Sequence, residues 1–339
     1  MKKISLFIII FLTFTLNNFS NDAEKFILSA EEKNATGNYA GAIKDYNEAL
    51  KLDPKNTDIY ISRAMAKDSL GDYADAIKDY NEALKIDPKD GYVYFFRGNA
   101  KDNLSDYAGA IKDYNEALKI DFKNAEAYYN RGLAKINLHD YAGASKDFTA
   151  ILKIDSKNVD AYIYRGITKD KLGDYAGAIK DYNEALKIKP KNADAYTYRG
   201  IAKDNLSDYA GAIKDYNEAL KIKPKNMSVY NNRGFAKNNL GDYTGAIKDY
   251  NEALKIDPKN ANIYLNRGIA KGNHDDYSGA IKDFSAAIEL DVKFTIAYYN
   301  RGLAKKAVGD LNGALEDLSK AAKSGHKEAY EEIEKIQKK

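Results

Sequence analysis

The sequence predicts an all-α protein built as a stack of short helical repeats, and three observations support this. The heptapeptide Lys-Asp-Tyr-Asn-Glu-Ala-Leu recurs verbatim six times, starting at Lys44, Lys78, Lys112, Lys180, Lys214 and Lys248. Its copies keep a period of 34 residues, and a fixed period of about 20–50 residues is typical of repeat arrays. Within each period, apolar residues recur three and four residues apart, which is the spacing of amphipathic helices.

The fifth repeat, residues 159–192, shows how each period divides into two helices. Its first helix is marked by Tyr162, Gly166, Lys169 and Leu172, and its second by Tyr175, Ala178, Ile179, Tyr182, Ala185, Leu186 and Ile188. Gly166 and Ala178 are small, and we expect the two helices to approach each other closely at these residues.

The residues between the helices predict where each helix begins and ends. Gly173 suits the left-handed conformation that ends a helix, and Asp174 suits the cap of the next helix. Pro190 is expected to end the second helix, and Asn192 to cap the first helix of the following repeat. Other repeats replace the turn glycine with residues that also form turns, namely Ser105, His139, Ser207 and Asp275.

This repeat resembles the tetratricopeptide repeat. The matching residues are Leu172-Gly173-Asp174-Tyr175, Ala178, Tyr182, Ala185 and Pro190. Arg165 and Lys169 depart from the family pattern, which usually has Leu and an aromatic residue there, and they look like a bacterial Tyr-x-x-Arg-Gly subtype. The resemblance implies a right-handed α-solenoid of about nine helix-turn-helix repeats within residues 21–328, followed by a C-terminal capping helix over 329–339. The repeats start at Ala23, Thr57, Gly91, Ala125, Val159, Ala193, Met227, Ala261 and Thr295.

Residues 1–20 have the form of a removable signal peptide. Lys2 and Lys3 precede the uncharged apolar run Ile4–Leu16, and cleavage is expected near Ser20. The run is shorter than the roughly 20 residues of a spanning helix, so we expect no stable membrane span after the signal is removed. The expected location is therefore exported: periplasmic, envelope-associated or secreted. The alternative is a chain anchored in the membrane by an uncleaved N-terminal segment.

Composition argues against several classes of function. Lys+Arg 53 nearly balances Asp+Glu 50, so there is no basic footprint for nucleic acid. The chain has no Cys, which removes thiolate metal sites and Cys nucleophiles. His139, His274 and His326 fall at turns of different repeats and cannot converge on one centre. With no phosphate-binding glycine loop or hydrolase motif either, we expect no enzyme, no cofactor and no metal site.

One structural pairing is also predicted from the repeats. Eight repeats carry Arg at their seventh position, as at Arg165, and all nine carry Asp at the twenty-third, as at Asp181. We expect each Arg to pair with an Asp of its own or the preceding repeat. The alternative is that both face water, where such pairs contribute little.

The positions that vary between repeats give the candidate binding site. The resemblance implies that first helices line a concave groove through the second, fifth, sixth, ninth and twelfth positions, and that a partner's peptide or helix binds there. An amide side chain suits this task because it both donates and accepts hydrogen bonds. The candidate groove residues are Asn130, Asn232, Asn266, Asn300, Tyr129, Tyr164, Tyr198, Asn231 and Tyr299.

Apolar residues at the fifth and ninth positions would add a strip edged by carboxylates. Examples are Phe95 and Ile163 at the fifth position and Phe235 at the ninth, beside Asp170 and Asp204. The alternative is that ninth-position residues pack between first helices. No second, fifth or ninth position holds Lys or Arg, which disfavours a clamp for a partner's C-terminal carboxylate.

The sequence thus predicts a non-enzymatic module that binds a peptide or helix of another protein. The alternative is a structural or envelope-organising scaffold that assembles through its ends or its convex face.

Overall fold

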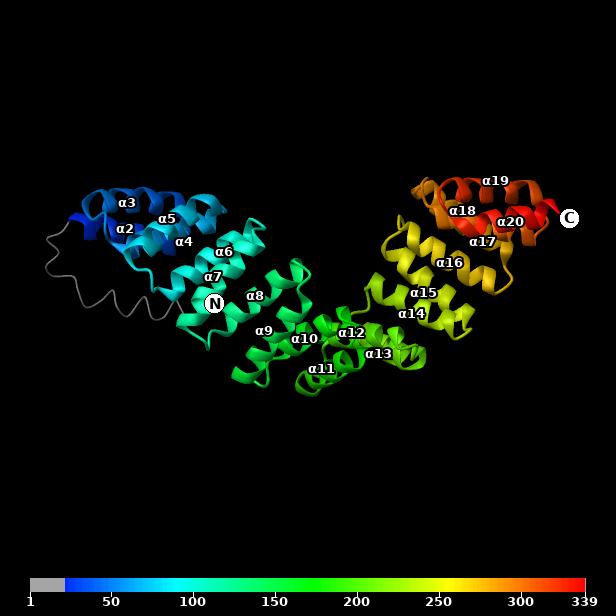
Figure 1. Cartoon of the computed structure of the whole chain (residues 1–339), viewed down its shortest axis with the longest axis horizontal. Helices are drawn as coiled ribbons and strands as arrows, with labels where there is room; N and C mark the ends of the chain where they lie inside the picture. Colours follow the sequence, from blue (N-terminus) through cyan, green and yellow to red (C-terminus); the bar gives the residue numbers. More distant parts are fainter. Residues whose placement is uncertain (1–21, 339) are drawn as a thin grey trace. The chain divides into compact units, whose positions relative to one another are not determined.

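The structure, a computed structural model, describes residues 22–338, which form helices and turns without a strand (Figure 1). The predicted signal peptide lies outside these residues. Contacts divide the chain into two compact bodies, with the division between Ser156 and Lys157. We call residues 22–156 the N-terminal body and residues 157–338 the C-terminal body, and describe each by itself.

Each body is a row of antiparallel helix pairs, one pair for each 34-residue repeat. In the N-terminal body the pairs are α2 (Asp22–Ala35) with α3 (Tyr39–Leu52), α4 (Thr57–Leu70) with α5 (Tyr73–Ile86), α6 (Gly91–Asn103) with α7 (Tyr107–Ile120), and α8 (Ala125–Asn137) with α9 (Tyr141–Ile154). In the C-terminal body they are α10 (Val159–Lys171) with α11 (Tyr175–Ile188), α12 (Ala193–Asn205) with α13 (Tyr209–Ile222), α14 (Met227–Asn239) with α15 (Tyr243–Ile256), α16 (Ala261–Asn273) with α17 (Tyr277–Leu290), and α18 (Thr295–Ala307) with α19 (Leu311–Lys323). The final helix, α20 (Lys327–Gln337), packs on α19.

The second helix of each pair also contacts the first helix of the next pair within its body. The result is an all-helical solenoid, as predicted.

The helix ends follow the predicted local signals. The Asp174 side chain accepts a hydrogen bond from the Gly177 N–H at the start of α11, and Asn192 accepts from the Ala195 N–H at the start of α12. Gly173 has φ of +82°, the left-handed conformation expected after a helix. Pro190 lies two residues beyond the last residue of α11.

In four repeats, a residue other than glycine adopts the same left-handed conformation at this turn. Ser105, His139, Ser207 and Asp275 have φ between 60° and 62°, where a Cβ atom is strained. The 34-residue period therefore fixes the backbone of this turn even where glycine is missing.

In six of the nine repeats, the core has an aromatic ring from the second helix against a glycine of the first, at Gly98, Gly132, Gly166, Gly200, Gly234 and Gly268. Tyr216 is fully buried, and a Cβ added to Gly200 would lie 2.5 Å from its Cε1 atom. A Cβ added to Gly166 would likewise lie 2.5 Å from Tyr182 Cε1. The predicted close approach at Gly166 is thus confirmed, and an aromatic ring is what requires it.

The helix α20 covers the end of the C-terminal body. Ala329 and Ile336 are buried against residues of α19, and Ile333 packs on the same cluster. Lys306 of α18 donates to Glu332 at 2.6 Å, and this hydrogen bond lowers the pKa of Glu332. The helix presents its remaining charged residues to solvent, as a capping segment does.

Candidate functional site: the first-helix face

Neighbouring first helices contact one another directly, most regularly in the C-terminal body. There the contacts run from α10 through α12, α14 and α16 to α18. Consecutive second helices are held further apart. We call the surface made by the second, fifth, sixth, ninth and twelfth residues of the first helices the first-helix face. Positions five, nine and twelve share one side of a helix because they are separated by four and three residues.

The predicted asparagines all lie on this face and are half-buried. Asn232, Asn266 and Asn300 occupy the sixth position of three consecutive first helices, α14, α16 and α18. The side-chain NH2 of Asn266 donates to Asn231 Oδ1 at 3.0 Å, and that of Asn300 donates to the Ile296 carbonyl at 2.8 Å. The Asn231 NH2 lies 3.5 Å from Asn232 Oδ1, at the limit of hydrogen bonding. In the N-terminal body, Asn130 donates to Asn99 Oδ1 at 2.9 Å.

These bonds give the amides a fixed orientation. Within residues 22–338, the side-chain oxygens of Asn266 and Asn300 accept no hydrogen bond, while their NH2 groups donate within the chain. Each amide oxygen can accept two hydrogen bonds. The face therefore offers these oxygens as acceptors for donors of a bound molecule.

The predicted tyrosines occupy different environments. The Tyr198 side chain is 37% exposed, and its ring stacks on Tyr182 with 6.1 Å between centroids. Tyr164 is half-buried on α10. The Tyr129 ring meets Phe148 edge to face at 6.1 Å. Tyr299 stacks on His326 with 4.0 Å between centroids and packs against the cluster beneath α20, so its ring helps to hold the capping helix.

The apolar strip is narrower than the sequence suggested. Phe95, Ile163 and Leu265 at the fifth position are buried, because these three side chains pack into core clusters with residues of the second helices. The expectation that they line the groove is wrong.

At the ninth position, some residues pack against the core and others are exposed on the first-helix face. Ile167, Ile201 and Ile269 pack partly against the core clusters, whereas Phe235 is 47% exposed. Phe235 is therefore the main apolar side chain that the C-terminal body exposes at this position.

Carboxylates at the twelfth position line the same face. Burial raises the pKa of Asp68, Asp102, Asp170 and Asp204. For Asp204, burial outweighs the hydrogen bond from the Tyr216 hydroxyl at 2.6 Å and raises the pKa to about 6. Asp204 Oδ1 is buried and accepts no hydrogen bond within the described chain. These carboxylates are thus poorly compensated charges beside half-buried apolar residues.

The predicted Arg–Asp pairs lie elsewhere, between the first and second helices of each repeat. Arg199 donates from Nε to Asp215 at 2.9 Å and from Nη2 at 2.5 Å, so the pair is bidentate. The other seven arginines pair in the same way with the Asp of their own repeat; they are Arg63, Arg97, Arg131, Arg165, Arg233, Arg267 and Arg301. The prediction is confirmed, and the alternative of solvated pairs is wrong.

Three further kinds of partner recur around the Arg–Asp pairs and were not predicted; Arg301 has Ser285 where most of the pairs have an asparagine. Lys203 approaches Asp215 at 2.8 Å, Asn183 of the preceding repeat accepts from Arg199 at 2.6 Å, and the Arg199 guanidinium lies 5.3 Å from the Tyr196 ring centroid. Sequence offered a signal for these contacts, because Tyr, Arg, Lys, Asp and Asn recur at the same phases as the pair. The contact to Asn183 links one repeat to the next.

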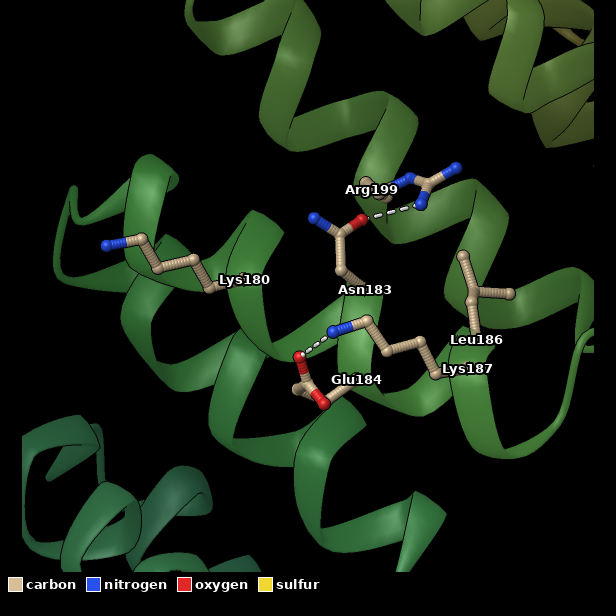
Figure 2. Close-up of a pocket in the computed structure, with 6 residues that line it drawn as sticks. All are labelled: Lys180, Asn183, Glu184, Leu186, Lys187 and Arg199. Carbon is tan, nitrogen blue, oxygen red and sulfur yellow. Dashed lines mark hydrogen bonds and ion pairs between the residues drawn. The ribbon is translucent and has the colours of Figure 1, made fainter.

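An open hollow of about 400 Å³ lies beside this network, where α11 meets α12 (Figure 2). Its lining residues are Lys180, Asn183, Glu184, Leu186, Lys187 and Arg199. Similar hollows recur between α13 and α14 and, in the N-terminal body, between α7 and α8.

This hollow is a less suitable candidate binding site than the first-helix face, because it arises from residues that recur in most repeats. Figure 2 shows Arg199 bonded to Asn183 and Lys187 bonded to Glu184, at 2.6 Å in each case. Both lining pairs are thus already engaged within the chain, and the same residues recur in most repeats. A surface that distinguishes one partner from another requires the residues that vary, which lie on the first-helix face.

Neither a metal centre nor a bilayer-spanning helix is present in the described chain. Within residues 22–338, no three His, Asp or Glu side chains come together in a way that could hold a metal ion. His139 contacts Tyr141 at its turn, and His326 lies under Tyr299. No helix between residues 22 and 338 combines the length and the apolar character needed to cross a bilayer.

Comparison with known proteins identifies the family. A sequence model described as "TPR repeat" matches residues 31–67, 103–138, 171–203, 205–241 and 238–275. Two further models described as "Tetratricopeptide repeat" match residues 57–90 and 125–158. The first alone matches more than half of the chain, so the chain belongs to the tetratricopeptide-repeat family. No curated protein matches it.

Two solved structures of tetratricopeptide-repeat proteins support the same fold. The C-terminal part of a TPR repeat-containing protein from Cytophaga hutchinsonii is 19% identical, with a TM-score of 0.59 over 70% of this chain and 98% of that one. A tetratricopeptide repeat protein from Parabacteroides merdae is 22% identical, with a TM-score of 0.54 over 73% of this chain and 98% of that one. The MamA protein is 26% identical over 51% of this chain and 94% of its own, with a TM-score of 0.47.

Proposed function

We propose that this protein binds a segment of another protein on its first-helix face and performs no chemistry itself. The observation that carries the proposal is the row of asparagines at one position of α14, α16 and α18. Internal hydrogen bonds orient the amides of Asn266 and Asn300, and their oxygens remain for a partner's donors. A main-chain N–H is such a donor in every peptide, whatever its sequence.

The rigidity of the stack supports the same proposal. Seven of the nine repeats contain both a buried aromatic ring and an Arg–Asp pair, so we expect the face to exist before a partner arrives. A preformed surface loses less conformational entropy on binding than a flexible one. The capping helix α20 covers the last repeat with a charged surface, which speaks against assembly through that end.

The test is affinity capture from an extract of the source organism, using the full-length chain as bait. We expect the triple variant Asn232→Ala, Asn266→Ala and Asn300→Ala to lose the captured partner. A matched triple variant, Lys180→Ala, Lys214→Ala and Lys248→Ala, changes exposed residues of the second helices and should retain it. Equal recovery with the asparagine variant contradicts the proposal.

We also propose that the protein acts after export. Mass spectrometry of the protein from its source organism should then find a mature chain that begins near Asn21. A chain that retains residues 1–20 would support the membrane-anchored alternative.

A further inference from the structure

The first helices of the C-terminal body carry asparagine oxygens that accept no hydrogen bond within residues 22–338. On the first-helix face, the NH2 groups of Asn266 and Asn300 donate within the chain at 3.0 and 2.8 Å. Next to this face, at the thirteenth position of α12, α14 and α16, the NH2 groups of Asn205, Asn239 and Asn273 donate within the chain over 2.9–3.5 Å. Their five side-chain oxygens accept no hydrogen bond within residues 22–338. Each NH2 group uses one of its two N–H bonds in this way, whereas each oxygen keeps its full capacity of two hydrogen bonds for donors of a bound molecule.

Two carboxylates extend this row on α10 and α12. Asp170 and Asp204 occupy the same position of adjacent first helices, and Asn205 Nδ2 lies 3.5 Å from Asp170 Oδ1 across the helix boundary. Tyr216 donates to Asp204 at 2.6 Å, but no Lys or Arg is paired with either carboxylate within the described chain. This differs from the Arg–Asp network, where Asp215 is bound by both Arg199 and Lys203.

Cations near this face are few. Burial raises the pKa of Asp170, and the charge of Lys171 acts against this rise. Lys223 pairs with Asp194, the second residue of α12, at 2.9 Å. Lys306 occupies the twelfth position of α18 and pairs with Glu332 of the capping helix at 2.6 Å. Lys171 is exposed at the end of α10. The face therefore has an excess of negative charge around Asp170 and Asp204, although the whole chain is nearly neutral.

Apolar groups lie between the acceptors. Phe235 on α14 is 47% exposed and Tyr198 on α12 is 37% exposed, with Ile167 and Ile201 half-buried beside them. A segment that fits this face must cover apolar surface and supply donors at the same time.

We infer that the natural occupant of this face is a positively charged segment of a partner protein, in which Lys or Arg alternates with aliphatic or aromatic residues. The inference rests on the proposed function and adds the chemistry of the partner. The cationic side chains are attracted by the charges of Asp170 and Asp204 and donate to the amide oxygens, and the apolar side chains cover Phe235 and Tyr198. An acidic segment would place like charges against Asp170 and Asp204, which is unfavourable.

The probe is a random-peptide phage library selected on the full-length chain, with the selected peptides then resynthesised and their affinities measured by fluorescence anisotropy. We expect enrichment of peptides that carry Lys or Arg together with apolar residues, and binding that weakens as salt increases. The double variant Asp170→Asn and Asp204→Asn should reduce their affinity about tenfold, since two negative charges that attract the peptide are removed. The matched variant Glu184→Gln and Glu218→Gln removes the same charge from the second helices and should leave affinity within twofold.

The outcomes separate this inference from the proposed function. Enrichment of acidic or uncharged peptides that lose affinity in the Asn232→Ala, Asn266→Ala and Asn300→Ala variant would overturn the basic partner and leave the face intact. Basic peptides that bind the Asp170→Asn and Asp204→Asn variant as tightly as the unaltered chain would also overturn it. Failure to enrich any peptide, or binding insensitive to every first-helix variant, would overturn both.

Discussion

The contact between Gly200 and Tyr216 gives a stability prediction whose size follows from the structure. In a Gly200→Ala variant, the new Cβ would lie 2.5 Å from Tyr216 Cε1 and 2.9 Å from both Cδ1 and Cζ. The ring has little freedom to move, because it is fully buried and its hydroxyl donates to Asp204 at 2.6 Å. Overpacking of this kind costs about 3 kcal/mol, and the better helix propensity of Ala returns about 1 kcal/mol. We expect a net loss of about 2 kcal/mol.

Gly272 provides the matched control on another first helix. A Cβ added there meets only Ala280 Cβ, at the ordinary contact distance of 3.9 Å. Gly272→Ala should therefore be neutral or stabilising by up to about 1 kcal/mol. Urea unfolding followed by far-UV circular dichroism measures both variants. If Gly200→Ala is as stable as Gly272→Ala, then the glycine is not required by the aromatic ring and the account of the core is wrong.

Three further variants test charges and turns. Burial raises the pKa of Asp204 to about 6 in the folded chain, above about 3.9 in the unfolded chain. Ionisation of this carboxyl therefore destabilises the folded chain fully above pH 6, and this effect is lost as the pH falls toward 4. Asp204→Asn should therefore raise the free energy of unfolding by about 1 kcal/mol at pH 7.5, after allowance for partial exposure, and by almost nothing at pH 4; a gain that is the same at both pH values would contradict this. Asp215→Asn leaves the largely buried Arg199 and Lys203 without a carboxylate and should cost about 3 kcal/mol in urea unfolding, whereas a loss below about 1 kcal/mol would show that the pair is effectively solvated. Ser207→Gly relieves a φ of 60° and should raise stability by about 0.5–1 kcal/mol in the same assay; a lower stability would mean that the turn is not strained.

The fold could be predicted because its determinants are local and repeated. Asp174 and Asn192 cap the helices that follow them, and Gly173 adopts the left-handed turn, since each depends only on near neighbours in the chain. The pairing of Arg165 with Asp181 was predictable for a related reason, because both residues recur with the same period.

The surface could be predicted only in part. Amphipathic spacing does not say whether a helix turns its fifth or its ninth residue toward the second helices, and this is why Phe95 and Ile163 were assigned to the groove although they are buried. The 34-residue period also does not predict the distances between side chains of neighbouring first helices. Asn231 and Asn266 could be assigned to one face, but their hydrogen bond to each other could not be foreseen.

The absence of cysteine from the chain allows the most direct test of where a partner binds. A Phe235→Cys variant places a single thiol on the first-helix face, and a Lys180→Cys variant places one on an exposed second-helix position. Their rates of alkylation by a maleimide are measured with and without the captured partner or a selected peptide. We predict that binding slows alkylation at position 235 at least tenfold and leaves position 180 unchanged. Protection of position 180 with position 235 still reactive would contradict binding on the first-helix face.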